Sequence, residues 1–502
     1  MDWKKLKSGS DVRGKAVGED AVITCAVARA LGMAFARRIA EQKGRATSDI
    51  TIALGRDSRI TGETLLEATA DGISRAGGRV LDFGLCTTPA MFMSIITPGF
   101  EPDGAIMITA SHHPWDRNGL KFFTAQGGIE GHDVEEILEA AQKLDPLACP
   151  VSGKIEKKAF LPVYTEQLIQ RIRQGLHSSE EKPLKGIHIV VDAGNGAGGF
   201  YAEMLKRLGA DTSGSQFLNP DGMFPNHIPN PENPEAISSL RSAVIQSCAD
   251  LGVIFDTDCD RAAVADSDGR EINRNRLIAL ISGILLEKKK GLTIVTDSVT
   301  SSGLKKYIES RGGIHYRFKR GYRNVIDEAI RLNQEGKDCP LAIETSGHAA
   351  LKENYFLDDG MYLVTVLIVK AMQLKQEGKS LGSLIADLPE PVESTEIRLN
   401  ITDAAFFKKG SECIQKVVEK GEKDPAWHIA EDNREGIRVS FDLANRKDSG
   451  WFLLRLSVHD PVLPLNCESD VPGGVKEMLS SLAEVLRKID GIDLAPLEKA
   501  IS

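Results

Sequence analysis

Short apolar runs that end in turns rich in Gly or Asp recur along this 502-residue chain, and helical patterns separate them. Each run is typical of a buried strand. Strands that alternate with helices form α/β units whose pairing is mainly parallel. Ligands in such sheets bind beyond the carboxyl ends of the strands, where these polar turns lie. The predicted strands are 50–54, 187–191, 251–255 and 292–295, and examples of helical patterns are 21–40 and 234–247.

The last hundred residues have a different pattern. A helical segment at 404–419 precedes two predicted strands, at 437–441 and 451–457. Helices grouped around neighbouring strands indicate a separate α+β domain. A closing helix has one apolar face, made by Val475, Met478, Leu479, Leu482, Val485, Leu486 and Ile489.

Polar stretches near 152–160, 268–275 and 386–395 divide the chain. The length is that of three to four domains of ordinary size. We therefore expect three similar α/β domains with mixed, mainly parallel sheets, followed by an α+β domain. The expected domains are 1–156, 157–270, 271–388 and 389–502.

Composition excludes several classes of protein. The net charge of −9, without a long Lys/Arg block, argues against general nucleic-acid binding. The apolar run 277–286 is too short to span a bilayer and is interpreted as a buried helix. Eight scattered cysteines form no C-x-x-C pair, which indicates reduced thiols rather than a zinc site. No secretory signal is visible at 1–5. We expect a cytoplasmic protein with no nucleic-acid or membrane partner.

Ser111 follows the apolar run 105–108 and is therefore expected at the end of a strand. A lone Ser at such a place is more often a cap of the next turn. The segment is not the G-x-S-x-G nucleophile elbow, which counts against an esterase. Ser111 is singled out by its neighbours within ten residues, His112, His113, Asn118 and Lys121.

An acidic cluster, Asp256, Asp258 and Asp260, follows the predicted strand 251–255. A solvated acidic turn is one alternative, although a rigid strand end holds these carboxylates. An EF-hand is a second alternative, but its loop requires a Gly at the position of Arg261. A D-x-D-x-T/V phosphatase would not have Asp260 at its fifth position. Oxygen ligands at alternate positions suit Mg²⁺. Together with Ser111, the cluster predicts a phosphoserine beside its metal site.

Two further loops follow apolar runs. Glu344, Ser346 and His348 come after 341–343 and could bind the hydroxyls of a sugar, although this signal alone is weak. Arg455 follows the strand that begins at Trp451. Arg is a natural bidentate ligand of phosphate, but an Arg paired with a carboxylate is an equally good interpretation without context.

These segments, in this order over nearly the whole chain, resemble the α-D-phosphohexomutase family. T-A-S-H-H-P and N-G-L-K resemble its phosphoserine loop, D-T-D-C-D-R its metal loop, and E-T-S-G-H its sugar loop. R-L-S-V-H-D-P resembles its C-terminal phosphate loop. D-V-R-G at 11–14, G-R-D-S-R at 55–59 and the segment 220–234 are further similarities. The resemblance implies a central cleft between the domains.

The resemblance also implies residue roles. Ser111 would carry a phosphoryl group that passes to a hexose phosphate and returns from a hexose 1,6-bisphosphate. Mg²⁺ would be bound by Ser111 and the three Asp. The implied cations are Arg13, Lys121 and Arg261, and His112 would also be catalytic. Lys121 or His348 would transfer the proton, and a Lys in that role needs a lowered pKa. The implied substrate contacts are Arg261, Lys319, Glu344, Ser346, His348, Arg455, Ser457 and His459.

Several positions depart from the family pattern. His113 stands where Asn is usual, and Val458 and His459 replace a small residue and a Thr. The segment 318–323, in the place of a specificity loop, is unusually basic. The change in the phosphate loop moves the sequence away from typical phosphoglucosamine mutases. A small-molecule sugar phosphate, glucose or mannose phosphate, is the expected partner of a monomer or homodimer. Glucosamine phosphate is the second choice of substrate. The alternatives are a metal-dependent sugar-phosphate phosphatase and a binding protein without turnover.

Overall fold

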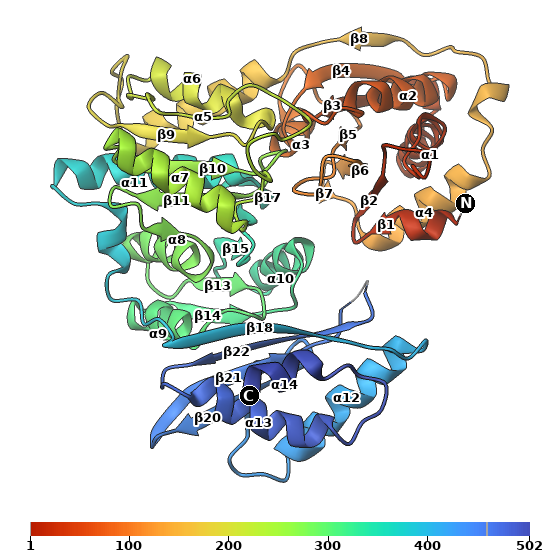
Figure 1. Ribbon diagram of the computed structural model, residues 1–502. Helices are drawn as coiled ribbons and strands as arrows, with labels where there is room; N and C mark the ends of the chain where they lie inside the picture. Colours follow the sequence, from red (N-terminus) through yellow and green to blue (C-terminus); the bar gives the residue numbers. More distant parts are fainter. Residues whose placement is uncertain (1, 458–459) are drawn as a thin grey trace. The chain divides into compact units, whose positions relative to one another are not determined.

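The computed structural model describes residues 2–457 and 460–502 (Figure 1). The chain divides into two compact units. The first unit contains Met1–Ile281 and Ser346–Leu384, and the second contains Ser282–Thr345 and Ile385–Ser502.

The first sheet of unit 1 has the strand order β1-β2-β6-β5-β3-β4-β8, with β7 paired to β6. Its middle, from β5 through β3 and β4 to β8, is parallel, whereas β1, β2 and β6 pair antiparallel. Its strands are β1 (Lys7–Ser8), β2 (Asp11–Lys15), β3 (Thr51–Arg56), β4 (Arg79–Leu85), β5 (Gly104–Ile108), β6 (Arg117–Thr124), β7 (Gly127–Gly128) and β8 (Ile155–Lys157).

Helices of this region are α1 (Cys25–Lys43), α2 (Gly62–Arg75), α3 (Thr88–Ile96) and α4 (Gly131–Gln142). Helix α1 begins where the Thr24 side chain accepts the Val27 amide, and it ends at Gly44 in the left-handed region. It packs closely on α2 at Gly72, where the absence of a side chain allows the contact. A Cβ at this position would lie 1.9 Å from the Arg29 carbonyl oxygen. The buried faces of both helices join the core of the sheet.

The second sheet of unit 1 has the order β12-β11-β10-β9. Strands β9 and β10 are parallel, but β10, β11 and β12 are antiparallel neighbours. The acidic loop makes a direct turn from β10 into β11, so the prediction of parallel pairing does not hold at this place. The elements are α5 (Leu161–Gly175), β9 (Ile189–Asp192), α6 (Phe200–Arg207), α7 (Pro234–Ser247), β10 (Leu251–Phe255), β11 (Ala262–Asp266) and β12 (Glu271–Ile272).

A later segment of the chain also belongs to unit 1. The hairpin of β16 (Ala349–Leu351) and β17 (Leu357–Asp358) precedes the buried helix α11 (Gly360–Gln376). Asp359 begins this helix by accepting the Tyr362 amide, and it also accepts the Tyr164 hydroxyl of α5 at 2.8 Å. The return of the chain thereby places β17 within the fold of unit 1.

Unit 2 contains parallel strands in the order β14-β13-β15 and a C-terminal antiparallel sheet in the order β18-β22-β21-β20-β19. Helix α8 (Arg274–Lys288) crosses the boundary between the units. The other elements are β13 (Thr293–Thr296), α9 (Ser302–Ser310), β14 (Ile314–Arg317), α10 (Tyr322–Gln334), β15 (Leu341–Ile343), β18 (Glu393–Asn400), α12 (Phe406–Gly421), β19 (His428–Ile429), β20 (Ile437–Leu443), β21 (Arg446–Leu454), β22 (Val462–Ser469), α13 (Gly474–Leu486) and α14 (Ala495–Ile501).

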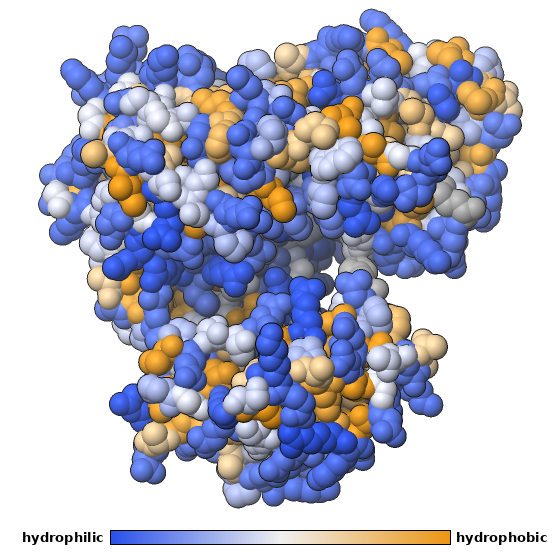
Figure 2. Space-filling model, in the orientation of Figure 1, coloured by the Kyte–Doolittle hydropathy of each residue, from blue (hydrophilic) through white to orange (hydrophobic). Residues whose placement is uncertain are grey.

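The predicted fold class is confirmed, with α/β regions followed by an α+β region. The C-terminal sheet has two long strands, β18 and β22, that the sequence pattern did not indicate. Among the described residues, no helix is long and apolar enough to cross a membrane. Hydrophilic residues cover most of the face in Figure 2, with apolar residues scattered among them.

Candidate functional site

Ser111 lies in the turn that leads from β5 toward β6, with its side chain fully buried. Its Oγ donates to Asp256 Oδ2 at 2.9 Å and lies 3.3 Å from His112 Nδ1. Its φ of 53° is in the left-handed region, which costs a residue with a Cβ roughly 1 kcal/mol. Strain of this kind is often found at functional sites, where surrounding contacts maintain it. The Ser111 turn and the acidic loop therefore meet at this hydroxyl.

Buried polar contacts hold the Ser111 turn in place. The Ser111 amide donates to Thr109 Oγ1 at 2.8 Å, and Thr109 donates to Asp57 Oδ2 at 2.6 Å. Arg59, which is 1% exposed, forms an ion pair with Asp57 at 3.2 Å. Its guanidinium also donates to the carbonyl oxygens of Ser111, His113, Pro114 and Arg117.

The acidic loop brings its three carboxylates together. Asp256, Asp258 and Asp260 are buried, and they offer oxygens that all lie within 4.8 Å of one another. One oxygen of Asp258 and one of Asp260, both Oδ1, receive no hydrogen bond from any described residue. Buried carboxylate oxygens without donors are suited to a hard divalent cation. The donor set therefore fits the metal predicted for this loop.

Lys121 lies between two of these carboxylates. Its Nζ is 2.8 Å from Asp258 Oδ2 and also contacts Asp260. Burial lowers the pKa of Lys121, but the charges of Asp258 and Asp260 outweigh burial and raise this pKa well above its usual value. The lowered pKa that a Lys needs to transfer the proton is therefore not found for Lys121 in this arrangement. The neighbours that decide it are anions.

The carboxylates differ in their affinity for protons. Burial, followed by the charges of Asp260 and Asp258, raises the pKa of Asp256 well above its usual value. Burial also acts on Asp260, but Lys121 and the other cations around it lower its pKa overall. These surroundings therefore disfavour the charged form of Asp256 and favour that of Asp260. A bound divalent cation would favour the ionised form of all three.

The predicted histidines and Arg13 lie in buried or half-buried positions. Arg13 pairs with Asp11 on the same strand at 2.6 Å. Burial, followed by the charge of Arg261, lowers the pKa of His112 far below its usual value. Burial and Arg13 lower the pKa of His113 to about 3. Both imidazoles are therefore neutral at pH 7, and His112 can accept a proton only at low pH in this state.

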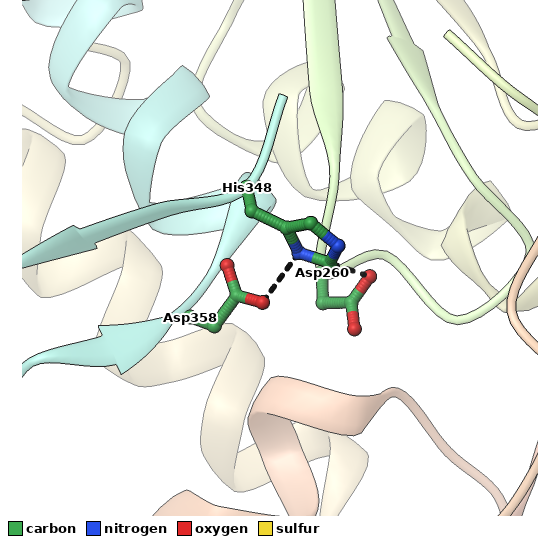
Figure 3. Close-up of side chains that lie close together, drawn as sticks. All are labelled: Asp260, His348 and Asp358. Atoms are coloured by element: carbon green, nitrogen blue, oxygen red, sulfur yellow. Dashed lines mark ion pairs between the residues drawn. The ribbon is translucent and has the colours of Figure 1, made fainter. Parts of the chain in front are cut away.

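His348 is held between a carboxylate and a guanidinium, as Figure 3 shows for its acidic neighbours. Its Nδ1 lies 2.5 Å from Asp358 Oδ2 and 3.9 Å from Asp260 Oδ1. Its Nε2 accepts the Nε–H of Arg261 at 2.8 Å. The Arg261 amide in turn donates to Asp256 Oδ1 at 3.2 Å. The structure thus connects the sugar-loop histidine to the acidic loop within unit 1, which also contains the buried Ser346.

The remaining residues predicted to bind substrate lie in unit 2. Glu344 is buried and accepts the Gly321 amide at 2.5 Å. Lys319 is exposed, in the basic segment before α10. Arg455 is half-buried just after β21, and its Nε receives no hydrogen-bond partner from the described residues. Burial lowers the pKa of Arg455. Ser457 is half-buried, whereas His459 lies outside the described residues.

Comparison with known proteins gives the family. Residues 4–147, 162–269 and 273–392 match the family descriptions "Phosphoglucomutase/phosphomannomutase, alpha/beta/alpha" domains I, II and III. The chain is 31% identical to the phosphomannomutase of Escherichia coli, covering 92% of this chain and 94% of the relative. The chain belongs to the α-D-phosphohexomutase family.

Two further likenesses agree with this assignment. The phosphomannomutase/phosphoglucomutase of Pseudomonas putida is 30% identical over 84% of this phosphohexomutase and 83% of its own length. A crystal structure of a phosphoglucomutase/phosphomannomutase family protein from Burkholderia thailandensis has a TM-score of 0.79 at 27% identity, covering 97% of each chain. The protein is a phosphohexomutase, an intramolecular phosphotransferase.

The structure of this phosphohexomutase adds three site residues that sequence reasoning missed. Arg59 belongs to the segment G-R-D-S-R at 55–59, but the sequence did not indicate a role for it. Thr88, the first residue of α3, donates to Asp258 Oδ2 at 2.5 Å. Asp358 contacts His348. A Ser or Asp after an apolar run carries a local signal, but Arg59 and Thr88 act across long sequence separations, and Asp358 acts on a residue in another strand. The doublet Asp358-Asp359 before a helical pattern was the available signal for Asp358.

Proposed function

We propose that this phosphohexomutase interconverts hexose 1-phosphate and hexose 6-phosphate, with mannose and glucose phosphates as its substrates. The proposed catalytic group is Ser111, which carries a phosphoryl group and returns to that state through a hexose 1,6-bisphosphate. The proposed metal is Mg²⁺, with Ser111, Asp256, Asp258 and Asp260 as its ligands. Small-molecule sugar phosphates, the substrates implied by the family, are the partners.

One observation carries this proposal above the others: the Ser111 Oγ lies 2.9 Å from a carboxylate of the acidic loop. A phosphoryl group on this hydroxyl would lie beside three buried acidic groups, so its negative charge would have to be neutralised. Mg²⁺, when bound, would neutralise the charge on the phosphoryl oxygens. The oxygens of Asp258 and Asp260 that lack hydrogen-bond donors support ion binding at this loop.

The protein groups around the loop have separate proposed roles. Arg13, Lys121 and Arg261 bring positive charge to the acidic loop, which contributes to binding of phosphoryl oxygens. His112 lies beside the Ser111 hydroxyl and His348 serves as the proton-transfer group. Glu344, Ser346 and Lys319 are proposed to contact the sugar. Arg455, Ser457 and His459 are proposed to bind the phosphate that is not transferred.

Several properties accompany the proposal. We propose domains at 1–156, 157–270, 271–388 and 389–502, a cytoplasmic location, and a monomer or homodimer. The eight cysteines, all free thiols, support a reducing compartment. Glucosamine phosphate is the second candidate substrate. A sugar-phosphate phosphatase with the same Ser111 is the competing reaction.

The test is a coupled assay with Mg²⁺, a trace of hexose 1,6-bisphosphate, and mannose 1-phosphate or glucose 1-phosphate. We expect conversion to the 6-phosphate without release of inorganic phosphate. Ser111→Ala should abolish turnover. The parent enzyme should gain the mass of one phosphoryl group, measured by mass spectrometry of the intact protein, and Ser111→Ala should not. Ser74→Ala is the matched control, because Ser74 is a buried serine that donates to the Gly153 carbonyl at 2.7 Å.

Each alternative outcome identifies a different activity. Stoichiometric phosphate release by the parent enzyme would replace the mutase proposal with the phosphatase. Turnover of glucosamine phosphate alone would replace the proposed substrates. Full turnover by Ser111→Ala would contradict the role of Ser111.

A further inference from the structure

The protonation of the His348 ring follows from its two neighbours. Arg261 Nε always carries a hydrogen, so it donates to His348 Nε2 at 2.8 Å and Nε2 must supply a lone pair. Since Nε2 supplies its lone pair to Arg261, a neutral ring carries its hydrogen on Nδ1, and this atom lies 2.5 Å from Asp358 Oδ2. The hydrogen-bond pattern therefore assigns the neutral tautomer with its hydrogen on Nδ1.

Asp358 is itself fixed in place. It is the last residue of β17, is 7% exposed, and pairs in register with Ala350. Its Oδ1 accepts the Ala349 amide at 3.1 Å, which leaves Oδ2 directed at His348 (Figure 3). The two carboxylate oxygens thus have different partners, and the backbone amide decides which oxygen faces the ring.

We infer that Asp358 is a positioning residue that holds His348 in the Nδ1–H tautomer, so that Nε2 is the atom that takes the proton of the sugar hydroxyl. This inference rests on the proposed function, because it concerns proton transfer in the same reaction. A carboxylate in this place orients an imidazole and stabilises the charge that the ring gains. A sugar hydroxyl that donates to Nε2 takes the place of the Arg261 Nε–H.

The transfer balances with His348 as the only proton carrier. The sugar oxygen forms its bond to the phosphorus of the phosphoserine, and its proton moves to Nε2. The bond from phosphorus to Ser111 Oγ breaks, and this oxygen leaves with the electron pair. After the bisphosphate has turned, the Ser111 oxygen bonds to the second phosphorus. The bond between that phosphorus and the sugar oxygen breaks, and His348 returns its proton to the sugar oxygen.

Asp358→Asn tests this role because the Ala349 amide dictates how the new side chain lies. The amide oxygen keeps the contact with Ala349, so the amide NH₂ faces His348 Nδ1. The ring must then accept at Nδ1 and carry its hydrogen on Nε2, where it cannot take a proton. We expect kcat to fall about 100-fold or more, the range of a lost general base. KM for glucose 1-phosphate should change less than about threefold, since Asp358 touches no phosphate in this scheme.

Nitrogen-15 NMR of the full-length enzyme reads the tautomer directly and needs no turnover. The His348 signals are identified by their loss in His348→Gln. We expect Nδ1–H in the parent and Nε2–H in Asp358→Asn. The double variant should be no slower than His348→Gln alone, because both changes remove one function. If the parent enzyme is inactive on hexose phosphates, the proposed function fails, while the tautomer still decides the inference.

Asp192→Asn is the matched control. Asp192 is also a buried carboxylate beside a buried histidine, with His227 Nε2 at 3.1 Å, and it lies outside the site. A similar change in melting temperature with kcat unchanged is expected for this variant. Nε2–H in the parent, or an unchanged kcat in Asp358→Asn, would overturn the role of Asp358. A further loss of kcat in the double variant, relative to His348→Gln, would also overturn it.

Discussion

The loops proposed to carry the chemistry in unit 1 and the loops proposed to bind substrate in unit 2 are built differently. In unit 1 the residues Ser111, Asp256, Asp258 and Lys121 are each 3% exposed or less, and each has a hydrogen bond or ion pair with a buried partner. In unit 2, Glu344 is buried, but Lys319 is exposed and Arg455 and Ser457 are half-buried. The Arg455 Nε receives no partner from residues 2–457 and 460–502.

This contrast separates two demands on a phosphohexomutase. Transfer of a phosphoryl group requires reacting groups held to a fraction of an ångström, which packing and buried hydrogen bonds provide. The proposed recognition of a sugar phosphate would rely on exposed or half-buried cations that gain their partner when the ligand binds. Substitutions at the buried groups of unit 1 should therefore change kcat and stability together, and substitutions of the exposed or half-buried cations in unit 2 should change KM alone.

The largest effect is expected for Arg59→Met. This change removes the donor to the carbonyl groups of the Ser111 turn and leaves Asp57 buried without its cation. Breaking a buried pair by removing one partner costs about 3–5 kcal/mol. A displaced Ser111 should lower kcat about 100-fold. Urea unfolding and the mutase assay measure the two effects.

Arg75→Met is the control for this variant, because Arg75 is a half-buried Arg of the same sheet region whose partner is Asp71. It should unfold within roughly 1 kcal/mol of the parent enzyme and keep its turnover. Normal kcat in a folded Arg59→Met enzyme would remove the link between the buried contacts and the chemistry.

Arg59 also marks the limit of prediction from sequence. The α/β pattern, the helix 234–247 and the closing helix were readable because each depends on local periodicity. Strand β18 was not, since its first half alternates half-buried and exposed residues and resembles a polar linker. Strand β11 was not predicted either, because the acidic residues do not indicate that their loop is a short turn that leads directly from β10 into an antiparallel neighbour.

The site divides in the same way. Ser111 and the three Asp were predicted because each follows an apolar strand and belongs to a recognisable string. The roles of Arg59, Thr88 and Asp358 depend on contacts with residues 52, 170 and 10 positions away. The direction of the Lys121 pKa shift could not be predicted for the same reason, because its neighbours were known only by type and not by distance.

Arg455→Ala should show the opposite behaviour to Arg59→Met. We expect KM for glucose 1-phosphate to rise about 10–100-fold, the range of a lost charge-assisted contact to phosphate. The melting temperature and the Mg²⁺ dependence should stay unchanged, because Arg455 is half-buried and apart from the acidic loop in sequence. Arg446→Ala, an exposed Arg on the same strand β21, is the control. Equal KM values in Arg455→Ala and the parent enzyme would contradict the role.

The acid sensitivity contributed by His113 should be smaller in size. The pKa of His113 is lowered from 6.5 to about 3, chiefly by burial. Its neutral form stabilises the fold above pH 6.5, and this contribution is lost as the pH falls from 6.5 toward 3. The loss is at most about 1.4 kcal/mol per pH unit. His113→Asn should therefore lose less stability than the parent between pH 7 and 5 in thermal unfolding. Identical pH profiles would show that other groups set the acid limit.

Lys319→Ala should have the smallest effect and tests the substrate side of the contrast most directly. An exposed cation that attracts a sugar phosphate through solvent contributes about 0.2–1 kcal/mol, so KM should rise about two- to fivefold at low salt. The increase should disappear at 1 M salt, where the screening length is about 3 Å. Lys290→Ala, also exposed and in unit 2, should leave KM unchanged at both salt concentrations. A salt-independent rise for Lys319→Ala, or any fall in kcat, would mean that Lys319 is held against the substrate as firmly as the groups around Ser111.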